Sequence, residues 1–342
     1  MNNKNIIFRT AILFMIAVLL GMFAGCFSKS NIENIEDEII IYDPSDGLPA
    51  PLEDGYIDIS AEMVPLTEFP AMFATVGMPS APGTVVQQNE KALIDMSNTK
   101  DGYVMIRYLN KTDKELRVQI KGPSGEVYTY TLKKSGEFEV FPLSDGNGTY
   151  KISVHENVTG IKYATVGSAT VNVKLNDEFA PFIRPNQYVN YTSDSKAVKK
   201  AAELTKNTKT MLEKVGAIYE YVIKNLTYDK DLAESVKSGY LPDIDKVLEK
   251  GKGICFDYAA VTTAMLRSQN IPTKLVVGYA DGIYHAWINT YSEETGWMDA
   301  VIYFDGKEWK LMDPTFASTS NQSAAIMQFI GKGENYIAKY LY

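Results

Sequence analysis

Cysteine and histidine are scarce in this chain, and one residue of each type is spaced for acyl-transfer chemistry. The 342 residues include two cysteines, Cys26 and Cys255, and two histidines, His155 and His285. His285 follows Cys255 by 30 residues, and Asp313 follows His285 by 28 residues. In acyl transfer a thiolate attacks an acyl carbon, an imidazole takes and returns the proton, and a carboxylate fixes the imidazole tautomer. The order of thiol, imidazole and carboxylate therefore predicts Cys255, His285 and Asp313 as a catalytic triad.

The residues around Cys255 favour a reactive thiol. Gly251 and Gly253 break the preceding helical pattern, so Cys255 falls at the start of a new helix. Unpaired backbone N–H groups and the positive end of the helix dipole stabilise a thiolate at that place. The backbone N–H of Cys255 is one expected oxyanion donor, and Tyr228 is our candidate for the second. Asp257 lies in the first helical turn, where we expect a structural role.

Each of these residues has a plainer interpretation when it is taken alone. A lone cysteine such as Cys255 is most often a small buried hydrophobic residue, and His285 alone would fit a satisfied core histidine. Asp299 and Asp305 are rival carboxylates, although Asp305 lies in a predicted turn. Trp287 could shield the site, support substrate or only fill the core. The triad hypothesis rests on thiol, imidazole and carboxylate occurring together in order.

Hydrophobic periodicity predicts the elements that position the three residues. Thr210 and Glu213 form a capping box that opens a clear helix. The expected elements are helices over 193–207, 210–226, 243–249 and 255–268, and strands over 273–279 and 284–289. A third strand, reached through a hairpin, ends at Asp313. The spacings suit groups that antiparallel pairing brings together.

Residues 210–315 resemble a transglutaminase-like domain, from a superfamily that shares the papain-like Cys-His-Asp constellation. The matching stretches are GKGICFDYA over 251–259, LRSQNIP over 266–272, GY over 278–279, HAW over 285–287 and MDPT over 312–315. The resemblance implies a papain-like, transglutaminase-like α+β domain. It also implies that Cys255 is the nucleophile, His285 the general base and acid, and Asp313 the orienting carboxylate.

The N-terminus has the pattern of an export signal. A short positively charged segment precedes an uncharged, mostly apolar run over 10–25, and Cys26 follows directly. This resembles a bacterial lipoprotein signal peptide, which implies removal of residues 1–25 and lipidation of Cys26. A plain transmembrane anchor and a conventional cleaved signal are the alternatives. We expect the protein at the cell membrane, lipid-anchored on its extracytoplasmic face.

The segments between the signal and the C-terminal domain predict a tether and a β-sandwich. Residues 26–65 are acidic and punctuated by proline, which favours a solvated linker. Residues 66–180 carry short β-rich runs with turn signals at regular spacing, the pattern of an antiparallel, immunoglobulin-like sandwich. The expected strands are 103–109, 116–120, 127–132, 138–141, 150–155 and 169–175. Residues 179–191, rich in proline and aromatics, predict a stiff connector to the α+β domain over 190–342, and His155 is expected at a strand end on the surface.

Composition narrows the function classes. A net charge of −8, from 34 Lys+Arg against 42 Asp+Glu, lacks the electrostatic footprint of a nucleic-acid binder. The scattered cysteines and histidines form neither a zinc motif nor a disulfide framework, and we expect no metal and no cofactor.

Two function hypotheses remain. The first is an exported, membrane-anchored thiol enzyme that acts on protein or peptide amides through a Cys255 thioester, which either an amine or water resolves. The second is a surface-anchored binding or scaffold protein whose sandwich recognises protein or cell-wall partners beside a vestigial transglutaminase-like domain. An intact set of Cys255, His285 and Asp313 favours the enzyme.

Overall fold

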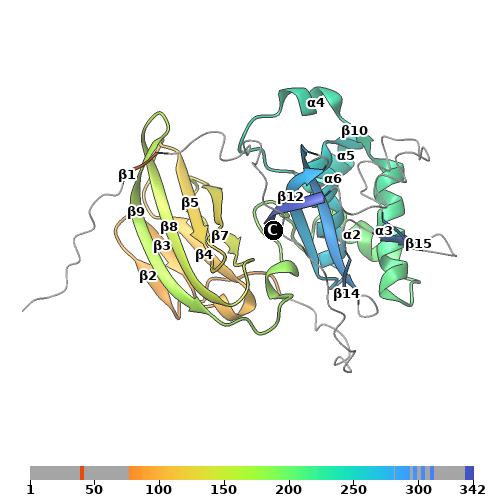
Figure 1. Ribbon diagram of the computed structural model, residues 1–342, viewed down its shortest axis with the longest axis horizontal. Coiled ribbons are helices and arrows are strands. Elements are labelled where there is room, and N and C mark those ends of the chain that lie inside the picture. Colours follow the sequence, from red (N-terminus) through yellow and green to blue (C-terminus); the bar gives the residue numbers. More distant parts are fainter. Residues whose placement is uncertain are drawn as a thin grey trace, which may run out of the picture. The chain divides into compact units, whose positions relative to one another are not determined.

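The computed structural model describes residues 39–41, 77–280, 282–292, 296–298, 302–304, 309–311 and 336–342. These residues belong to one compact unit that spans Ile39–Tyr342. The expected α+β architecture is confirmed, with antiparallel β-sheets first in the chain and a region of helices and sheet after them (Figure 1). Four residues discussed above lie outside the described residues: Cys26, Asp299, Asp305 and Asp313.

Two antiparallel sheets make up the N-terminal sandwich. One sheet has the order β1-β9-β8-β5-β6, and the other has the order β2-β3-β4-β7. The strands of the first are β1 (Ile39–Ile41), β9 (Lys162–Val173), β8 (Gly148–Thr159), β5 (Leu116–Lys121) and β6 (Val127–Leu132). The strands of the second are β2 (Val86–Gln88), β3 (Ala92–Asp95), β4 (Tyr103–Tyr108) and β7 (Glu139–Pro142). Buried residues alternate with partly exposed ones along β5 and β6, so each strand presents one face to the core.

All six expected strands are present, and three further strands were not predicted. β8 and β9 are each 12 residues long, about twice the predicted runs, and pair along most of their length. β2 and β3 are too short for their sequence to show a period. β1 lies inside the expected tether over 26–65, where it pairs with Lys162–Ala164 of β9.

The expectation for His155 was wrong, because the residue lies within β8 and is only 2% exposed. Its Nδ1 is 3.2 Å from the hydroxyl of Thr165 on β9. The predicted strand was too short, which placed His155 at an end that the real strand passes. A bulge between Val154 and His155 shifts the register there.

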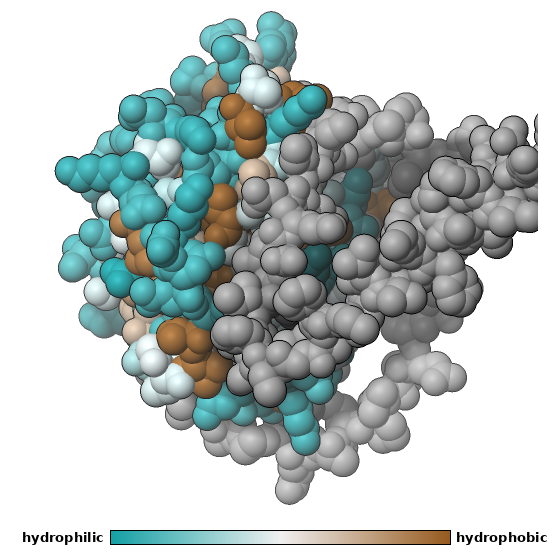
Figure 2. Space-filling model, turned by 90° about the vertical axis from the view of Figure 1, so that its left-hand side faces the viewer, coloured by the Kyte–Doolittle hydropathy of each residue, from teal (hydrophilic) through white to brown (hydrophobic). Residues whose placement is uncertain are grey.

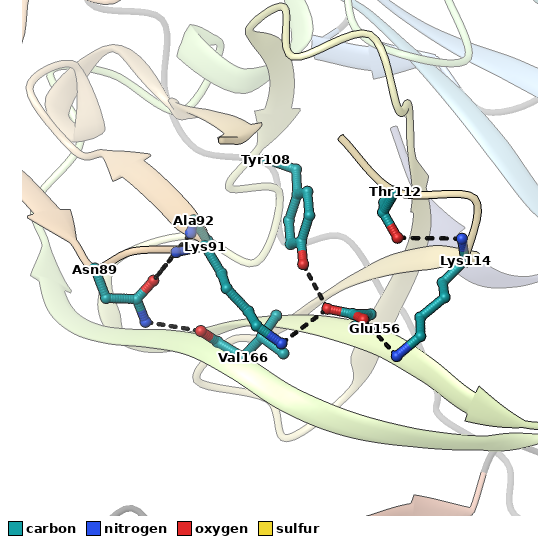
Figure 3. Close-up of polar contacts among 8 residues, drawn as sticks. All are labelled: Asn89, Lys91, Ala92, Tyr108, Thr112, Lys114, Glu156 and Val166. Carbon is teal, nitrogen blue, oxygen red and sulfur yellow. Dashed lines mark hydrogen bonds and ion pairs between the residues drawn. The ribbon is translucent and has the colours of Figure 1, made fainter. Parts of the chain in front are cut away.

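A buried carboxylate joins the two sheets of the sandwich (Figure 3). Glu156 of β8 forms ion pairs with Lys114 at 2.7 Å and Lys91 at 3.0 Å, and accepts a hydrogen bond from the Tyr108 hydroxyl of β4. Burial works to raise the pKa of Glu156, but the hydrogen bonds from these three residues together lower it to about 2. Asn89 adds a second link, because its side chain donates to the Val166 carbonyl of β9 at 2.7 Å.

The region after the sandwich packs helices against a four-stranded sheet of order β14-β13-β12-β17. Its helices are α2 (Lys196–Thr205), α3 (Met211–Asn225), α4 (Lys230–Ser235), α5 (Ile244–Lys250) and α6 (Cys255–Arg267). Its sheet strands are β12 (Thr273–Ala280), β13 (Ile283–Ser292), β14 (Gly296–Met298) and β17 (Tyr336–Leu341). The remaining pairs are β10 (Thr227–Tyr228) with β11 (Lys252–Gly253), and β15 (Ile302–Phe304) with β16 (Trp309–Leu311).

Most of the expected elements of this region are confirmed. The predicted capping box opens α3, since Glu213 N–H donates to the Thr210 hydroxyl and Thr210 N–H donates to the Glu213 carboxylate, both at 3.2 Å. α4 was not predicted, because no helix was expected between the helices over 210–226 and 243–249. The predicted third strand is present as β16, but it pairs with β15 in a separate two-stranded sheet.

The connector after the sandwich is packed rather than loose. It includes a short 3-10 helix, η3 (Ala180–Phe182), all of whose residues are buried. The ring of Phe179 packs against Tyr291 of β13 and Trp297 of β14, with centroids 4.4 and 5.8 Å away. Its aromatic residues therefore hold the two regions of the chain together, as predicted for a stiff joint.

The face drawn in Figure 2 is mostly hydrophilic, with hydrophobic residues in separate patches. The large hydrophobic residues exposed on the sandwich include Val85, Val86, Val158 and Ile161. Of the helices that the structure describes, none combines the length and hydropathy that crossing a bilayer requires.

Candidate active site

Cys255 is the first residue of α6, as the sequence predicts. Gly251 ends α5 in the left-handed conformation at φ 63°, and its N–H donates to the Val247 carbonyl at 3.0 Å. Gly253 is required by close packing, because a Cβ on it would lie 2.6 Å from the Cβ of Asp257. The two glycines therefore stop one helix and let the chain approach the start of the next.

Asp257 holds the first turn of α6. Its carboxylate accepts the Ile254 N–H at 2.9 Å and the Tyr240 hydroxyl at 2.8 Å, and the residue is fully buried. Burial raises the pKa of Asp257, while these two hydrogen bonds act in the opposite direction. Because the Ile254 carbonyl accepts the first intrahelical bond, from Tyr258, the N–H of Cys255 precedes the helical hydrogen-bond ladder. That N–H is thus placed to serve an incoming oxyanion.

Tyr228 is held beside this turn by β10. The strand pairs in parallel with β11, since Thr227 N–H donates to the Gly251 carbonyl and Asp229 N–H donates to the Gly253 carbonyl, both at 2.9 Å. Burial, and after it the electrostatic effect of Cys255, raise the pKa of Tyr228. Its hydroxyl therefore stays protonated and remains a hydrogen-bond donor at neutral pH.

His285 lies on β13, opposite Gly278 of β12, and is 7% exposed. The Trp287 ring lies nearly parallel to its imidazole, at 18° with the centroids 6.4 Å apart. Gly278 makes room for Ile337 of β17 and for Trp287, because a Cβ on it would lie 2.0 Å from the Ile337 carbonyl oxygen and 2.9 Å from the Trp287 ring. Trp287 is 2% exposed and so supports the imidazole from within the fold.

One cavity of about 410 Å³ brings three of the predicted residues together: Cys255, His285 and Tyr228 all line it. Phe256, Tyr284 and Tyr342 are among its aromatic lining residues. A partly exposed thiol that shares a cavity with an imidazole and a phenol can carry out nucleophilic acyl chemistry. Among the residues that the structure describes, no three His, Cys, Asp or Glu side chains gather as a metal site.

Comparison with known proteins bears on the same part of the chain. Residues 198–314 match the family model of the transglutaminase-like superfamily, a range that includes Cys255, His285 and Asp313. This chain contains a transglutaminase-like domain. An uncharacterized protein of Bacillus subtilis strain 168, YebA, is 28% identical over 118 residues, which cover 29% of this chain and 16% of YebA. The match thus spans only a small part of that relative.

Solved structures give partial superpositions. A candidate cysteine protease from Cytophaga hutchinsonii is 19% identical, at a TM-score of 0.32 over 68% of this chain and 69% of that one. A candidate protease from Parabacteroides distasonis is 14% identical, at 0.26 over 61% and 62%. Red sea bream transglutaminase is also 14% identical, at 0.26 over 67% and 53%.

The cavity also has a wall that the sequence did not predict. Arg117, Thr129 and Thr131 of the sandwich line it, as do residues of the loop between α4 and α5, including Lys237. The polar positions of β5 and β6 look like any solvent-facing strand residues in the sequence. Only the packing of the sandwich against the transglutaminase-like domain makes them part of the site.

Proposed function

We propose that the transglutaminase-like domain is a thiol-dependent enzyme that transfers the acyl group of protein or peptide amides. The observation that carries this proposal is the shared cavity, which is lined by Cys255 at the start of α6, His285 of β13 and Tyr228 of β10. The sequence order of Asp313 after His285 supports it as the orienting carboxylate.

The reaction follows from the groups present. The Cys255 sulfur attacks the amide carbonyl carbon while its proton passes to His285. The Cys255 N–H and the Tyr228 hydroxyl would stabilise the oxyanion of the tetrahedral intermediate. The C–N bond then breaks, the leaving nitrogen takes the proton from His285, and a thioester remains. An amine resolves the thioester to a new amide, or water resolves it to a carboxylate.

Thiol labelling tests the proposed nucleophile. We expect iodoacetamide to alkylate Cys255 near pH 7 faster than a free model thiol, and His285→Ala to slow the labelling at least tenfold. His155→Gln is the matched control, because it removes the other histidine and lies in the sandwich. Labelling no faster than the model thiol, or independent of His285, would leave the scaffold hypothesis in its place.

A substrate assay separates the two outcomes of the thioester. The full chain is incubated with a glutamine-containing protein and a labelled primary amine, and amine incorporation, ammonia release and peptide cleavage are measured. We expect at least one of these, and its loss in Cys255→Ala. Incorporation identifies a crosslinking transferase, and cleavage or ammonia release alone identifies a hydrolase. Activity that persists in Cys255→Ala contradicts the proposal.

We also propose that the enzyme is anchored to the outer face of the cell membrane through lipid on Cys26. The support is the apolar run over 10–25 and the small residues before the cysteine. Mass spectrometry of the protein isolated from membranes should show a lipidated N-terminal Cys26, and Cys26→Ala should release or misprocess it. An unmodified N-terminus at another residue contradicts this anchor.

A further inference from the structure

The cavity that contains Cys255 is bounded on one side by the sandwich. Arg117 of β5 and Thr129 and Thr131 of β6 line it together with Cys255 and His285. β6 is an end strand of its five-stranded sheet, and its two threonines point to the partly exposed face. The two strands therefore form part of the same cavity as Cys255.

Tyr188 of the connector fixes this wall relative to the nucleophile. Its ring packs against Tyr130 of β6 at 5.7 Å, Phe256 of α6 at 5.5 Å and Tyr342 at 4.4 Å between centroids. Phe256 follows Cys255 directly in the chain. One aromatic side chain thus bridges from the sandwich core to the residue after the thiol.

Hydrogen bonds attach the same connector to β6. Gln187 donates through Nε2 to the Thr131 carbonyl, and also to the Glu139 carboxylate at 3.1 Å. The Tyr188 hydroxyl donates to the Thr129 carbonyl at 3.5 Å. The sandwich wall is therefore a fixed part of the cavity and not a loosely tethered module.

The loop between α4 and α5 supplies a second cation to the lining of the cavity. Lys237 is exposed and lines the cavity. Its carbonyl accepts the Tyr240 N–H at 3.2 Å, which closes a turn, and the Tyr240 hydroxyl is bonded to Asp257 at 2.8 Å. Lys237 is thus tied to the first turn of the nucleophile helix.

The charge of the lining is one-sided. Among the described residues that line the cavity, Arg117 and Lys237 are cationic and none is Asp or Glu. Arg117 is partly compensated by Glu115, whose carboxylate lies 3.2 Å away and is 61% exposed. For Lys237, no carboxylate of a described residue lies within 4 Å. A cleft with one sign of charge attracts ligands of the other sign.

We propose that the two cations of this lining, Lys237 and Arg117, select the acyl donor. Cys255 then acts on polypeptides with an acidic side chain next to the reactive amide. That carboxylate would face Lys237 and Arg117, with the aromatic residues packing against the rest of the chain. The inference rests on the proposed function of Cys255, because it names the substrate class of that same site.

Three peptides test the selection by turnover. They share one reactive glutamine and differ only in a flanking Glu, Ala or Lys. With the full chain at low salt, we expect kcat/KM for the Glu peptide to exceed that for the Lys peptide about tenfold, and salt to reduce this ratio. Lys237→Glu should bring the ratio to one or below. Lys121→Glu is the matched control, since Lys121 is exposed on β5 but does not line the cavity, and it should leave the ratio unchanged.

Binding gives a second readout that needs no catalysis. The affinities of the same labelled peptides for Cys255→Ala, with and without Lys237→Glu, are measured by fluorescence anisotropy. Tighter binding of the Glu peptide that Lys237→Glu removes supports the selection even if no peptide is turned over, in which case only the proposed function fails. The proposed selection is overturned if turnover and binding do not distinguish the Glu peptide from the Lys peptide, or if Lys121→Glu changes the ratio as much as Lys237→Glu does. Thiol-dependent turnover can still be present in either case.

Discussion

Substituting Gly253 by alanine should disrupt the turn that presents Cys255. The added Cβ would lie 2.6 Å from the Asp257 Cβ and 2.8 Å from its Oδ2, and separations under 3.0 Å are essentially never found for real Cβ atoms. The Asp257 side chain cannot move away easily, because it is fully buried and accepts hydrogen bonds from the Ile254 N–H and the Tyr240 hydroxyl. Relief of the clash therefore requires Asp257 to move away from these partners.

The expected cost follows from two effects. Overpacking a buried site costs about 1–3 kcal/mol. Losing a hydrogen bond to a carboxylate costs about 1.5–3 kcal/mol. Gly253→Ala should therefore lower the free energy of unfolding by about 3–5 kcal/mol, a large part of the about 5–15 kcal/mol that typical proteins possess. The assay is urea unfolding followed by tryptophan fluorescence, with iodoacetamide labelling of Cys255 measured in parallel.

Two further changes isolate the clash. Gly216→Ala is the control for adding a methyl group, because nothing lies within 4 Å of its Cβ position inside α3, and we expect a gain of up to about 1 kcal/mol. In an Asp257→Gly background the Cβ contact is gone, so Gly253→Ala should cost less than about 1 kcal/mol. In Asp257→Ala the contact at 2.6 Å persists, and much of the cost should remain. Equal costs in the two backgrounds, or a cost below about 1 kcal/mol in the native chain, would refute the reasoning.

Three other substitutions test the sandwich, the joint and the sheet. Glu156→Gln should lower the free energy of unfolding in urea by about 2 kcal/mol at pH 7. Because the pKa of Glu156 in the folded protein is lowered to about 2, the whole difference from wild type should be present above about pH 4.5 and should shrink as the pH falls toward 2. A difference that does not change with pH contradicts this prediction. Tyr188→Leu should cost about 2–4 kcal/mol and slow Cys255 labelling. Tyr188→Phe keeps the ring and loses the hydroxyl, which donates to the Thr129 carbonyl at 3.5 Å, so it should cost about 1 kcal/mol or less. Equal effects of the two substitutions would mean that the ring contacts are unimportant. Gly278→Ala should break the pairing of β12 with β17, because the new Cβ would lie 2.0 Å from the Ile337 carbonyl oxygen. Both the free energy of unfolding and the rate of Cys255 labelling should fall. Labelling at the wild-type rate contradicts this close approach.

The sequence predicts best what local backbone chemistry determines. The capping box of Thr210 and Glu213, the glycines before Cys255 and the helix start at the thiol all act within a few residues, and all three are present in the structure. Strand lengths and pairings depend on distant partners instead. For that reason β8 was predicted too short, His155 was misplaced, and the short strands β2, β3 and β10 were missed.

The candidate site also combines residues that the local sequence predicts with residues whose place depends on distant partners. Cys255, His285 and Tyr228 could be named from the sequence, and all three line one cavity, while Asp313 stays a prediction outside the described residues. Arg117 could not be predicted, because a polar residue on the outer face of a strand carries no sign of what covers it. Its place in the cavity depends on how the connector holds β6 against α6.

The stretch over 266–272, which matches the transglutaminase-like pattern without contributing a catalytic group, has a structural explanation at the far end of α6. Asn270 takes the left-handed conformation at φ 60°, and the Ile271 N–H donates back to the Leu266 carbonyl at 3.1 Å, which ends the helix. Arg267 is 1% exposed and donates to the carbonyls of Thr273, Arg184 and Tyr342. Burial lowers the pKa of Arg267 to about 10, so the guanidinium keeps its charge at neutral pH. Helix α6 is thus fixed at both ends, by Asp257 at its start and by Arg267 at its end. Since Arg184 belongs to the connector, the second attachment also ties α6 to the segment that carries Tyr188 and joins the sandwich.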